Sequence, residues 1–279
     1  MTTKKPLSDL NLMDRFLFSE AMEDPVILKT VLDILLGEDI TLKFPPQPEK
    51  EQRVSSLKRF VKLDVWAWDI KDVIYDTEVQ KKNTQNIPKR SRLYQSFIDT
   101  KLLKPGEVDF NALNKVYVIM IMPFDLFGYG LYQYTFEQRC LEIPDLSLGD
   151  DATRIFFNTH GTNAGDVNPE LIELLRYIEH TTEEVIQSCT SERIRKLHER
   201  IRLIKSNEEI GVKYMQEWEE RVIEKKEARQ EGLEEGRAEG HAQINQLYEK
   251  LLKAGRTDDV LRATQDKEYL ETLFQEFQL

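Results

Sequence analysis

The first third of the chain carries two different hydrophobic patterns. Residues 14–37 place apolar side chains every three or four positions, and Pro25 interrupts this pattern before Gly37 ends it. That spacing predicts two short helices. Residues 60–69 (FVKLDVWAWD) and 73–82 (VIYDTEVQKK) instead alternate apolar and polar side chains, as half-buried strands do. A hairpin of two strands is therefore expected after the two helices.

The next segments complete one order of elements. Residues 40–51 (ITLKFPPQPEKE) predict a brief strand that runs into a proline-rich loop, because proline cannot continue a ladder. Residues 88–103 predict a helix with Leu93, Phe97 and Ile98 facing inward. The nearly continuous apolar run KVYVIMIMPF predicts a strand covered on both faces, and GLYQYTFEQR and TRIFFNT predict further strands. The order is helix, three strands, helix, strand, which is an α/β arrangement.

The remainder of the chain has a helical pattern almost to its end. We expect a core over residues 1–167, a helical extension over 168–229, and a charged connector with short helices over 230–279. Residues 183–229 predict a long helix or a helical pair. Glycine recurs at positions 232, 236 and 240, and each glycine costs a helix about 1 kcal/mol relative to alanine. Close approach to another helix or a loosely helical charged connector would explain this repeat.

Acidic side chains follow one face of the predicted hairpin. A three-residue loop at 70–72 pairs Trp66 with Asp76 and Asp64 with Glu78, whereas a two-residue loop turns Glu78 to the apolar face. Burial of an unpaired carboxylate costs several kcal/mol, so the sequence favours the three-residue loop. Two explanations of the facing acids remain open. The face is solvated and Lys62 neutralises its neighbours, or a hard divalent cation such as Mg²⁺ lies between the carboxylates.

Charge and composition narrow the classes of partner. The net charge is −11, with −3 over residues 1–150 and −8 over 151–279, which disfavours nucleic acid for the chain as a whole. Residues 79–98 nevertheless contain no acid and five basic residues, and such a local stretch suits phosphate contact. No apolar run approaches the roughly 18–20 residues of a membrane span. Two cysteines without metal-type spacing point to a reducing cytoplasm.

The combination of motifs resembles a known family. An acid on one strand, an acid two residues before a polar residue on the next, and then a basic helix resemble the PD-(D/E)XK nucleases. The sequence is most similar to those of the Rpn-type recombination-promoting nucleases, which are also called PD-(D/E)XK family transposases. The similar segments are MDRFLFSEAM, KLDVWAWD, DTEVQ, IPKRSRLYQSFID, LNKVYVIMIMPFDLFGYGLYQYTF and the glycine-glutamate tail. The resemblance implies an αβββαβ restriction-endonuclease-like core, a mixed sheet flanked by helices, with a helical C-terminal extension.

The resemblance also implies a metal site and its chemistry. Asp64, Glu78 and the Val79 carbonyl would hold Mg²⁺, with Mn²⁺ as the alternative ion. Gln80 stands where the general nuclease pattern has lysine, so it can orient water but supplies no charge. The missing charge would come from the basic residues nearby, and these together with Tyr94 are the expected DNA contacts: Lys62, Lys82, Arg90, Arg92 and Tyr94.

The expected function is therefore that of a magnesium-dependent DNA endonuclease of the recombination-promoting type. The absence of the pattern's lysine supports the alternative, a catalytically weak or inactive nuclease-fold module that acts in DNA binding or protein assembly. DNA is the expected partner in the core. The acidic C-terminal helices, with leucines that short isolated helices cannot bury alone, predict self-association or a protein partner, and no membrane is expected.

Overall fold

The chain forms two compact units, Met1–Tyr214 and Met215–Leu279. The computed structural model describes residues 4–43, 47–52, 61–103 and 106–279, and it describes the side chains of all of these except 47–52 and 61–64. The first unit is a mixed sheet flanked by helices, and the second is helical. None of the helices within these ranges combines the length and the apolar character that a membrane crossing requires.

The elements of the first unit confirm the predicted αβββαβ order. In chain order they begin with η1 (Leu7–Asp9), α1 (Arg15–Met22), α2 (Pro25–Leu36), β1 (Gln47–Gln52), β2 (Val61–Trp68), β3 (Ile74–Val79) and α3 (Ile87–Leu102). They continue with η2 (Phe110–Ala112), β4 (Val116–Met122), β5 (Gln133–Phe136), β6 (Ala152–Asn158), η3 (Ala164–Asp166), α4 (Pro169–Glu179), α5 (Glu183–Ser188) and α6 (Glu192–Ser206). Pro25 opens α2, and Gly37 ends it with a left-handed backbone at φ 69°.

Six strands form one sheet in the order β1-β2-β3-β4-β6-β5. The pairs β1/β2, β2/β3 and β5/β6 are antiparallel, and β3/β4 and β4/β6 are parallel. The parallel step from β3 to β4 is joined through α3, as parallel neighbours require a crossover connection. β4 lies inside the sheet, and its residues contribute alternately to the cores on both faces, as its continuous apolar run predicts.

The first strand differs from the prediction for residues 40–51. Leu42 forms only an isolated bridge with Asp69, and the regular strand β1 begins later and includes Pro48. Among the described strands β1 lies at the edge of the sheet, next to β2. An edge strand tolerates proline because one of its sides needs no ladder hydrogen bonds.

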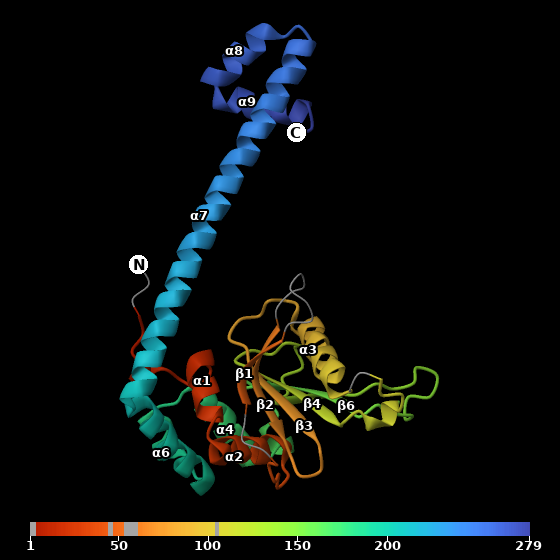
Figure 1. Cartoon of the computed structure of the whole chain (residues 1–279), viewed down its shortest axis with the longest axis vertical. Helices are drawn as coiled ribbons and strands as arrows, with labels where there is room; N and C mark the ends of the chain where they lie inside the picture. The colour runs from red at the N-terminus through yellow and green to blue at the C-terminus, as the bar shows by residue number, and fades with distance from the viewer. Residues whose placement is uncertain (1–3, 44–46, 53–60, 104–105) are drawn as a thin grey trace. The chain divides into compact units, whose positions relative to one another are not determined.

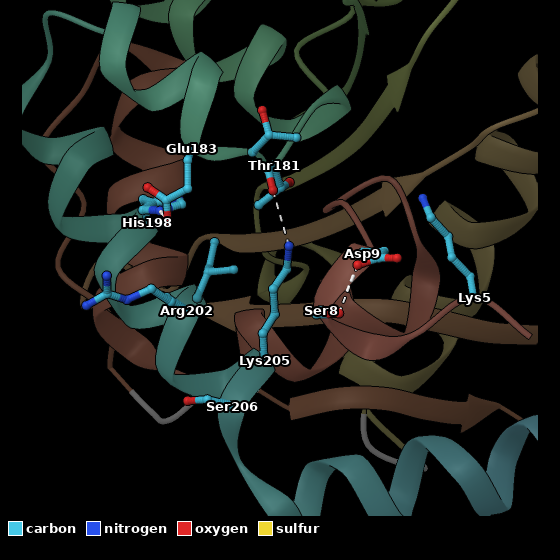
Figure 2. A pocket seen from close by; sticks show the side chains of 11 residues that line it. Lys5, Ser8, Asp9, Thr181, Glu183, His198, Arg202, Lys205 and Ser206 are labelled. Atoms are coloured by element: carbon cyan, nitrogen blue, oxygen red, sulfur yellow. Dashed lines mark hydrogen bonds and ion pairs between the residues drawn. The ribbon is translucent and has the colours of Figure 1, made fainter.

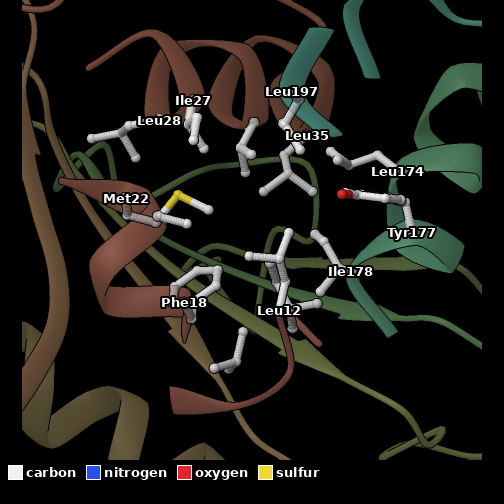
Figure 3. Close-up of a cluster of buried hydrophobic side chains, with 14 of the residues drawn as sticks. Leu12, Phe18, Met22, Ile27, Leu28, Leu35, Leu174, Tyr177, Ile178 and Leu197 are labelled. Atoms are coloured by element: carbon white, nitrogen blue, oxygen red, sulfur yellow. The ribbon is translucent and has the colours of Figure 1, made fainter. Parts of the chain in front are cut away.

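Helices cover both faces of the sheet (Figure 1). Helix α3 packs on one face over β2 and β4, and α1, α2, α4 and α6 pack together on the other. Figure 3 shows side chains of these latter helices converging, with Phe18 from α1, Leu28 from α2, Leu174 from α4 and Leu197 from α6. Within the first unit the sheet therefore has two separate hydrophobic clusters, one on each face.

The helices after residue 168 belong partly to the first unit. Helices α4, α5 and α6 contribute buried side chains to the same cluster as α1 and α2, so the predicted boundary at 167/168 falls inside one compact unit. The long helix or helical pair expected over 183–229 is instead α5, α6 and the beginning of α7 (Glu208–Lys253). Ser191 caps α6 through the N–H of Ile194, and Asn207 accepts the N–H of Glu209 at 2.8 Å. These caps explain the two breaks.

We expect Leu32→Ala to lower the free energy of unfolding of the first unit by about 2–5 kcal/mol, because Leu32 on α2 is completely buried. Urea denaturation followed by circular dichroism measures the change. The matched variant Leu203→Ala, at an α6 position that is 67% exposed, should change it by no more than about 0.5 kcal/mol. Equal effects of the two variants would contradict this assignment of the core.

The second unit has a small core of its own. The end of α7 packs with α8 (Thr257–Gln265) and α9 (Lys267–Glu276) around Leu247, Leu251 and Leu273 (Figure 1). The guanidinium of Arg256 forms ion pairs with Asp259 and with Glu276, which ties the α7–α8 turn to α9. Some of the leucines that the sequence left unburied are therefore buried within this unit.

The repeated glycines at 232, 236 and 240 lie within α7, which is continuous through them. A Cβ atom at any of the three would meet nothing within 4 Å among the described residues. Within the second unit no described helix therefore approaches these glycines closely, and the segment is a regular helix rather than a loosely helical connector.

Candidate active site

The turn between β2 and β3 confirms the predicted three-residue loop. The N–H of Asp69 donates to the carbonyl of Val73 at 3.0 Å, which closes the loop at residues 70–72. Asp72 has a left-handed backbone at φ 63°, as such loops require at their last position. The Asp69 carboxylate accepts the N–H groups of Lys71 and Val73 and the hydroxyl of Tyr75. Burial raises the pKa of Tyr75, and its hydrogen bond to Asp69 raises it further.

This loop sets the register of the hairpin. Val65 pairs with Thr77 and Trp66 with Asp76, as predicted from the three-residue loop. The observed pairs end at Val65 and Thr77. A continuation of this register by one pair would set the backbone of Asp64 opposite that of Glu78. The side chain of Asp64 lies outside the described residues, and so does that of Lys62.

The acidic face of β3 is buried. Asp76 is 0% exposed and Glu78 is 1% exposed, and they alternate with Tyr75 and Val79, which belong to the cluster on the opposite face. Ile74, on the same face as the two acids, packs in the cluster under α3. The explanation of a solvated face is therefore wrong, because α3 covers it. Carboxylates at such depth require cationic or hydrogen-bonding partners.

Arg90, on the helix α3 that covers this face, contacts Glu78 and Gln80. Its Nη2 atom lies 3.7 Å from Glu78 Oε2, and its Nη1 atom donates to Gln80 Oε1 at 2.8 Å. Its Nε atom donates to the hydroxyl of Tyr94 one turn further along α3, and its guanidinium lies 5.1 Å from the Tyr94 ring. The Arg90 side chain stays 35% exposed. The guanidinium is therefore held on several sides while it remains accessible from solvent.

The strand ends sooner than the alternating pattern predicts. β3 stops at Val79, although the N–H of Gln80 still donates to the carbonyl of Ile121 at 2.9 Å. The Gln80 side chain is fixed at both ends, since its Nε2 atom donates to the carbonyl of Lys82 at 2.8 Å. The alternating pattern placed Lys82 on the same strand face as Glu78. Lys82 is instead exposed in the loop after β3.

Only some of the α3 side chains that were expected to face the acids or the core do so. It begins at Ile87, next to Pro88, as predicted, and the buried stripe is Ile87, Ser91, Tyr94, Gln95 and Ile98. Leu93 was expected to face inward but is 38% exposed. Arg92 is also exposed, because two positions along a helix turn a side chain by about 200°. Tyr94 is 4% exposed, so it supports Arg90 and offers little surface to DNA.

Lys81, Asp14 and Asp76 lie at the site, although none of them was among the predicted site residues. Lys81, directly after Gln80, forms an ion pair with Asp14 at 3.1 Å, and Asp14 also caps α1 through the N–H of Phe16. This contact brings the N-terminus of α1 to the end of β3. The sequence placed Asp76 on the same strand face as Glu78 and opposite Trp66, but it gave Asp76 no role in the site. No local signal joins Asp14 to Lys81, which are far apart in the sequence.

The donor set suits a hard divalent cation. Asp76 and Glu78 present carboxylate oxygens to one face, and their backbones lie about 7 Å apart because each strand residue adds about 3.3 Å. Magnesium is held by one or two carboxylates together with substrate oxygens. Among the described residues no three histidine, cysteine or acidic side chains lie close enough together to hold an ion alone. The two cysteines are both free, and Cys189 is buried.

Comparison with known proteins agrees with this arrangement. Residues 14–231 match the family described as PD-(D/E)XK nuclease family transposase. No curated protein and no solved structure matches the chain. The matched region begins at Asp14 and includes the hairpin, α3 and all strands of the sheet. Since the match covers well over half of the sequence, the chain belongs to this family, the PD-(D/E)XK nuclease family transposases.

Proposed function

We propose that this protein is a divalent-metal-dependent DNA endonuclease that hydrolyses phosphodiester bonds in DNA recombination. The observation that carries the proposal is the contact of Arg90 with both Glu78 and Gln80, at the place where the general family pattern requires a positive charge. A nuclease site needs an acid to hold a cation and a fixed cation to face the phosphate. This face of the hairpin offers both.

In this proposal Asp64, Glu78 and the Val79 carbonyl would hold Mg²⁺, with Mn²⁺ as the alternative. A bound divalent cation would favour deprotonation of the attacking water and neutralise the charge that develops on the phosphate. The amide of Gln80, fixed by Arg90, orients that water. Hydrolysis then forms a bond from the water oxygen to phosphorus and breaks the bond from phosphorus to the leaving sugar oxygen.

The basic side chains have separate roles. Arg90 has five N–H donors, and those not used by Gln80 and Tyr94 can meet phosphate oxygens. Tyr94 positions the guanidinium. Lys62, Lys82 and Arg92 contact the DNA backbone further from the scissile bond, and such contacts contribute salt-dependent affinity.

Nicking of supercoiled plasmid by the full chain tests the function. We expect nicked circles in the presence of Mg²⁺ or Mn²⁺ and none in EDTA. Calorimetric titration of the metal-free protein with Mg²⁺ measures whether the site holds the ion. Absence of nicking with both ions would overturn the endonuclease proposal.

The same ion pair supports a second candidate function. The guanidinium of Arg90 lies beside Glu78 and could occupy the place of the metal, and Gln80 carries no charge. We would then expect neither ion binding nor nicking, and the protein would act as a nuclease-fold module in DNA binding or assembly. Detection of DNA binding without nicking would favour this candidate.

We further propose that the second unit mediates self-association and leaves DNA contact to the first, with the protein located in the cytoplasm. Leu252 and Leu261 remain 55% and 66% exposed although their neighbours form a core, and residues 215–279 carry 10 basic and 16 acidic residues, a net charge of −6. An acidic surface repels DNA. Two free cysteines suit a reducing compartment.

Truncation after Ile223 should lower the oligomeric state measured by light scattering and leave magnesium-dependent nicking unchanged. The truncation removes the core of the second unit but keeps every helix and strand of the first. The paired substitution Leu252→Gln and Leu261→Gln in the full chain should have the same effect with the helices retained. A truncated protein that keeps its oligomeric state and loses nicking would contradict this division of roles.

A further inference from the structure

A pocket of about 540 Å³, with charged side chains in its lining, opens in the first unit (Figure 2). It is lined by the N-terminal segment around η1, by residues at the start of α5, and by α6. Its lining includes Ile201, which is part of the hydrophobic cluster shared by α1, α2, α4 and α6. Glu78 and Arg90 lie on the α3 face of the sheet. The pocket is therefore a different place from the candidate active site.

Three cationic side chains line this pocket, namely Lys5, Arg202 and Lys205. Within the described ranges no carboxylate forms an ion pair with any of them at 4 Å or less. The two acids of the lining have other partners, since Glu183 meets His198 at 3.0 Å and Asp9 accepts the hydroxyl of Ser8 at 2.9 Å. A chain with net charge −11 thus collects three cations without ion-pair partners around one cavity.

Lys205 is the most informative of the three. Figure 2 shows its side chain extended along the pocket, where its Nζ atom donates to the carbonyl of Thr181 at 3.2 Å. An ammonium has three N–H donors, so two remain. Burial lowers the pKa of Lys205, and the nearby Lys5 lowers it further, while Asp9 and Glu183 raise it. A half-buried ammonium next to a second cation is an unfavourable arrangement that an anion would relieve.

The pocket wall is fixed before any ligand binds. Both nitrogens of His198 are engaged, Nδ1 with the hydroxyl of Tyr177 at 2.9 Å and Nε2 with Glu183. Thr181 is buried, and its hydroxyl accepts the N–H of Leu12 at 2.8 Å. The cations therefore face a preformed cavity, and its volume lies within the range of roughly 300–1,000 Å³ that small-molecule sites have.

We propose that this pocket binds the phosphate group of a small phosphorylated ligand of about mononucleotide size. A phosphate dianion offers three terminal oxygens and two negative charges, which matches three cations better than a single carboxylate does. Lys205 and Lys5 contact the phosphate, Arg202 adds a third positive charge, and the apolar part of the lining, which includes Ile201, receives the remainder of the ligand. This site is independent of the nuclease proposal and uses none of its residues.

Calorimetric titration of the full chain with deoxyadenosine monophosphate in EDTA tests the proposal, because EDTA excludes a metal-bridged phosphate at the hairpin. We expect binding of this nucleotide, weaker binding of inorganic phosphate, and none of deoxyadenosine. Lys205→Gln and Lys5→Gln should each weaken nucleotide binding at least tenfold, since each removes a charge-assisted hydrogen bond. Lys196→Gln, at an exposed position on the same helix α6 outside the pocket, is the matched control and should change nothing.

Three outcomes would overturn the proposal. The first is absence of binding of both the nucleotide and inorganic phosphate in the millimolar range. The second is equal binding of deoxyadenosine, which would remove the role of the phosphate, and equal affinity of the Lys196 and Lys205 variants for the nucleotide would count in the same way. In the third, the protein binds no nucleotide, and the Lys205 and Lys5 variants lose affinity for a short DNA duplex. The site would then be part of a DNA-binding surface. Thermal melts by circular dichroism show that each variant folds, and Lys5→Gln lies outside any α-helix, so it tests the pocket even if α6 is perturbed.

Discussion

Glu78→Gln should reduce magnesium-dependent plasmid nicking by about 10³-fold. The substitution keeps the size and shape of a side chain that is 1% exposed, removes its charge, and replaces one acceptor oxygen by an NH2 donor. A neutral amide holds Mg²⁺ far more weakly than a carboxylate does, and the loss of one electrostatic contact to a phosphoryl-transfer site costs about 10²–10³-fold in rate. Asp64→Ala should have an effect of the same order. The measurement is the initial rate of nicking at saturating Mg²⁺ and DNA.

Glu184→Gln is the control for this variant. Glu184 is an exposed acid on α5 in the same unit, so the change of charge is identical and the nicking rate should not change. Calorimetry should show weaker Mg²⁺ binding for Glu78→Gln only. Nicking by Glu78→Gln at the wild-type rate would rule out Glu78 as a metal-binding acid and would leave the candidate site without a function.

The register of the hairpin could be predicted from the sequence alone. The decisive quantity was whether the loop contains an odd or an even number of residues, because a shift of one residue moves every side chain of a strand to the other face. Polar side chains at 76 and 78 and apolar ones at 75 and 79 leave only one arrangement with the acids together. Asp69 and Asp72 then fit the turn, one by accepting its N–H groups and one by adopting the left-handed backbone.

The burial of that acidic face could not be predicted. Alternation identifies two faces but not what covers each of them, and α3 covers this one with a stripe that contains polar side chains. Ser91 and Gln95 are buried there, while the apolar Leu93 is exposed. The sequence of such a helix resembles that of a solvent-exposed helix. Its buried side chains are partly polar because the strand beneath it carries acidic side chains, so hydropathy does not identify the buried face.

In the C-terminal half of the chain, the sequence indicated where helices break but not where a helix continues. The breaks before α6 and α7 had local signals, Ser191 and Asn207, which cap the helices that follow. The continuity of α7 through three glycines has no such signal. The cost of about 1 kcal/mol for each glycine is a weak preference, and a helix of 46 residues with a packed end can offset it.

Arg90→Met should lower the nicking rate by about 10²-fold at saturating DNA, with a smaller effect on the DNA concentration required. Methionine retains an apolar side chain beside Tyr94 but removes the N–H donors that Arg90 directs to Gln80 and beside Glu78. If Arg90 faces the phosphate, its charge matters most when negative charge develops during the reaction. Arg90→Lys should recover part of the rate, since lysine restores a point charge but not the planar set of donors.

Arg92→Met separates this role from general attraction of DNA. Arg92 is two residues away on the same helix, carries the same charge, and is exposed. Its loss should weaken binding in a salt-dependent way and leave the rate at saturation within about twofold, as for a backbone contact distant from the reaction. Equal effects of the two substitutions would reduce Arg90 to one of several backbone contacts. A rate that falls for Arg90→Met, recovers in part with lysine and is unchanged for Arg92→Met would assign to Arg90 the charge that lysine supplies in the general nuclease pattern.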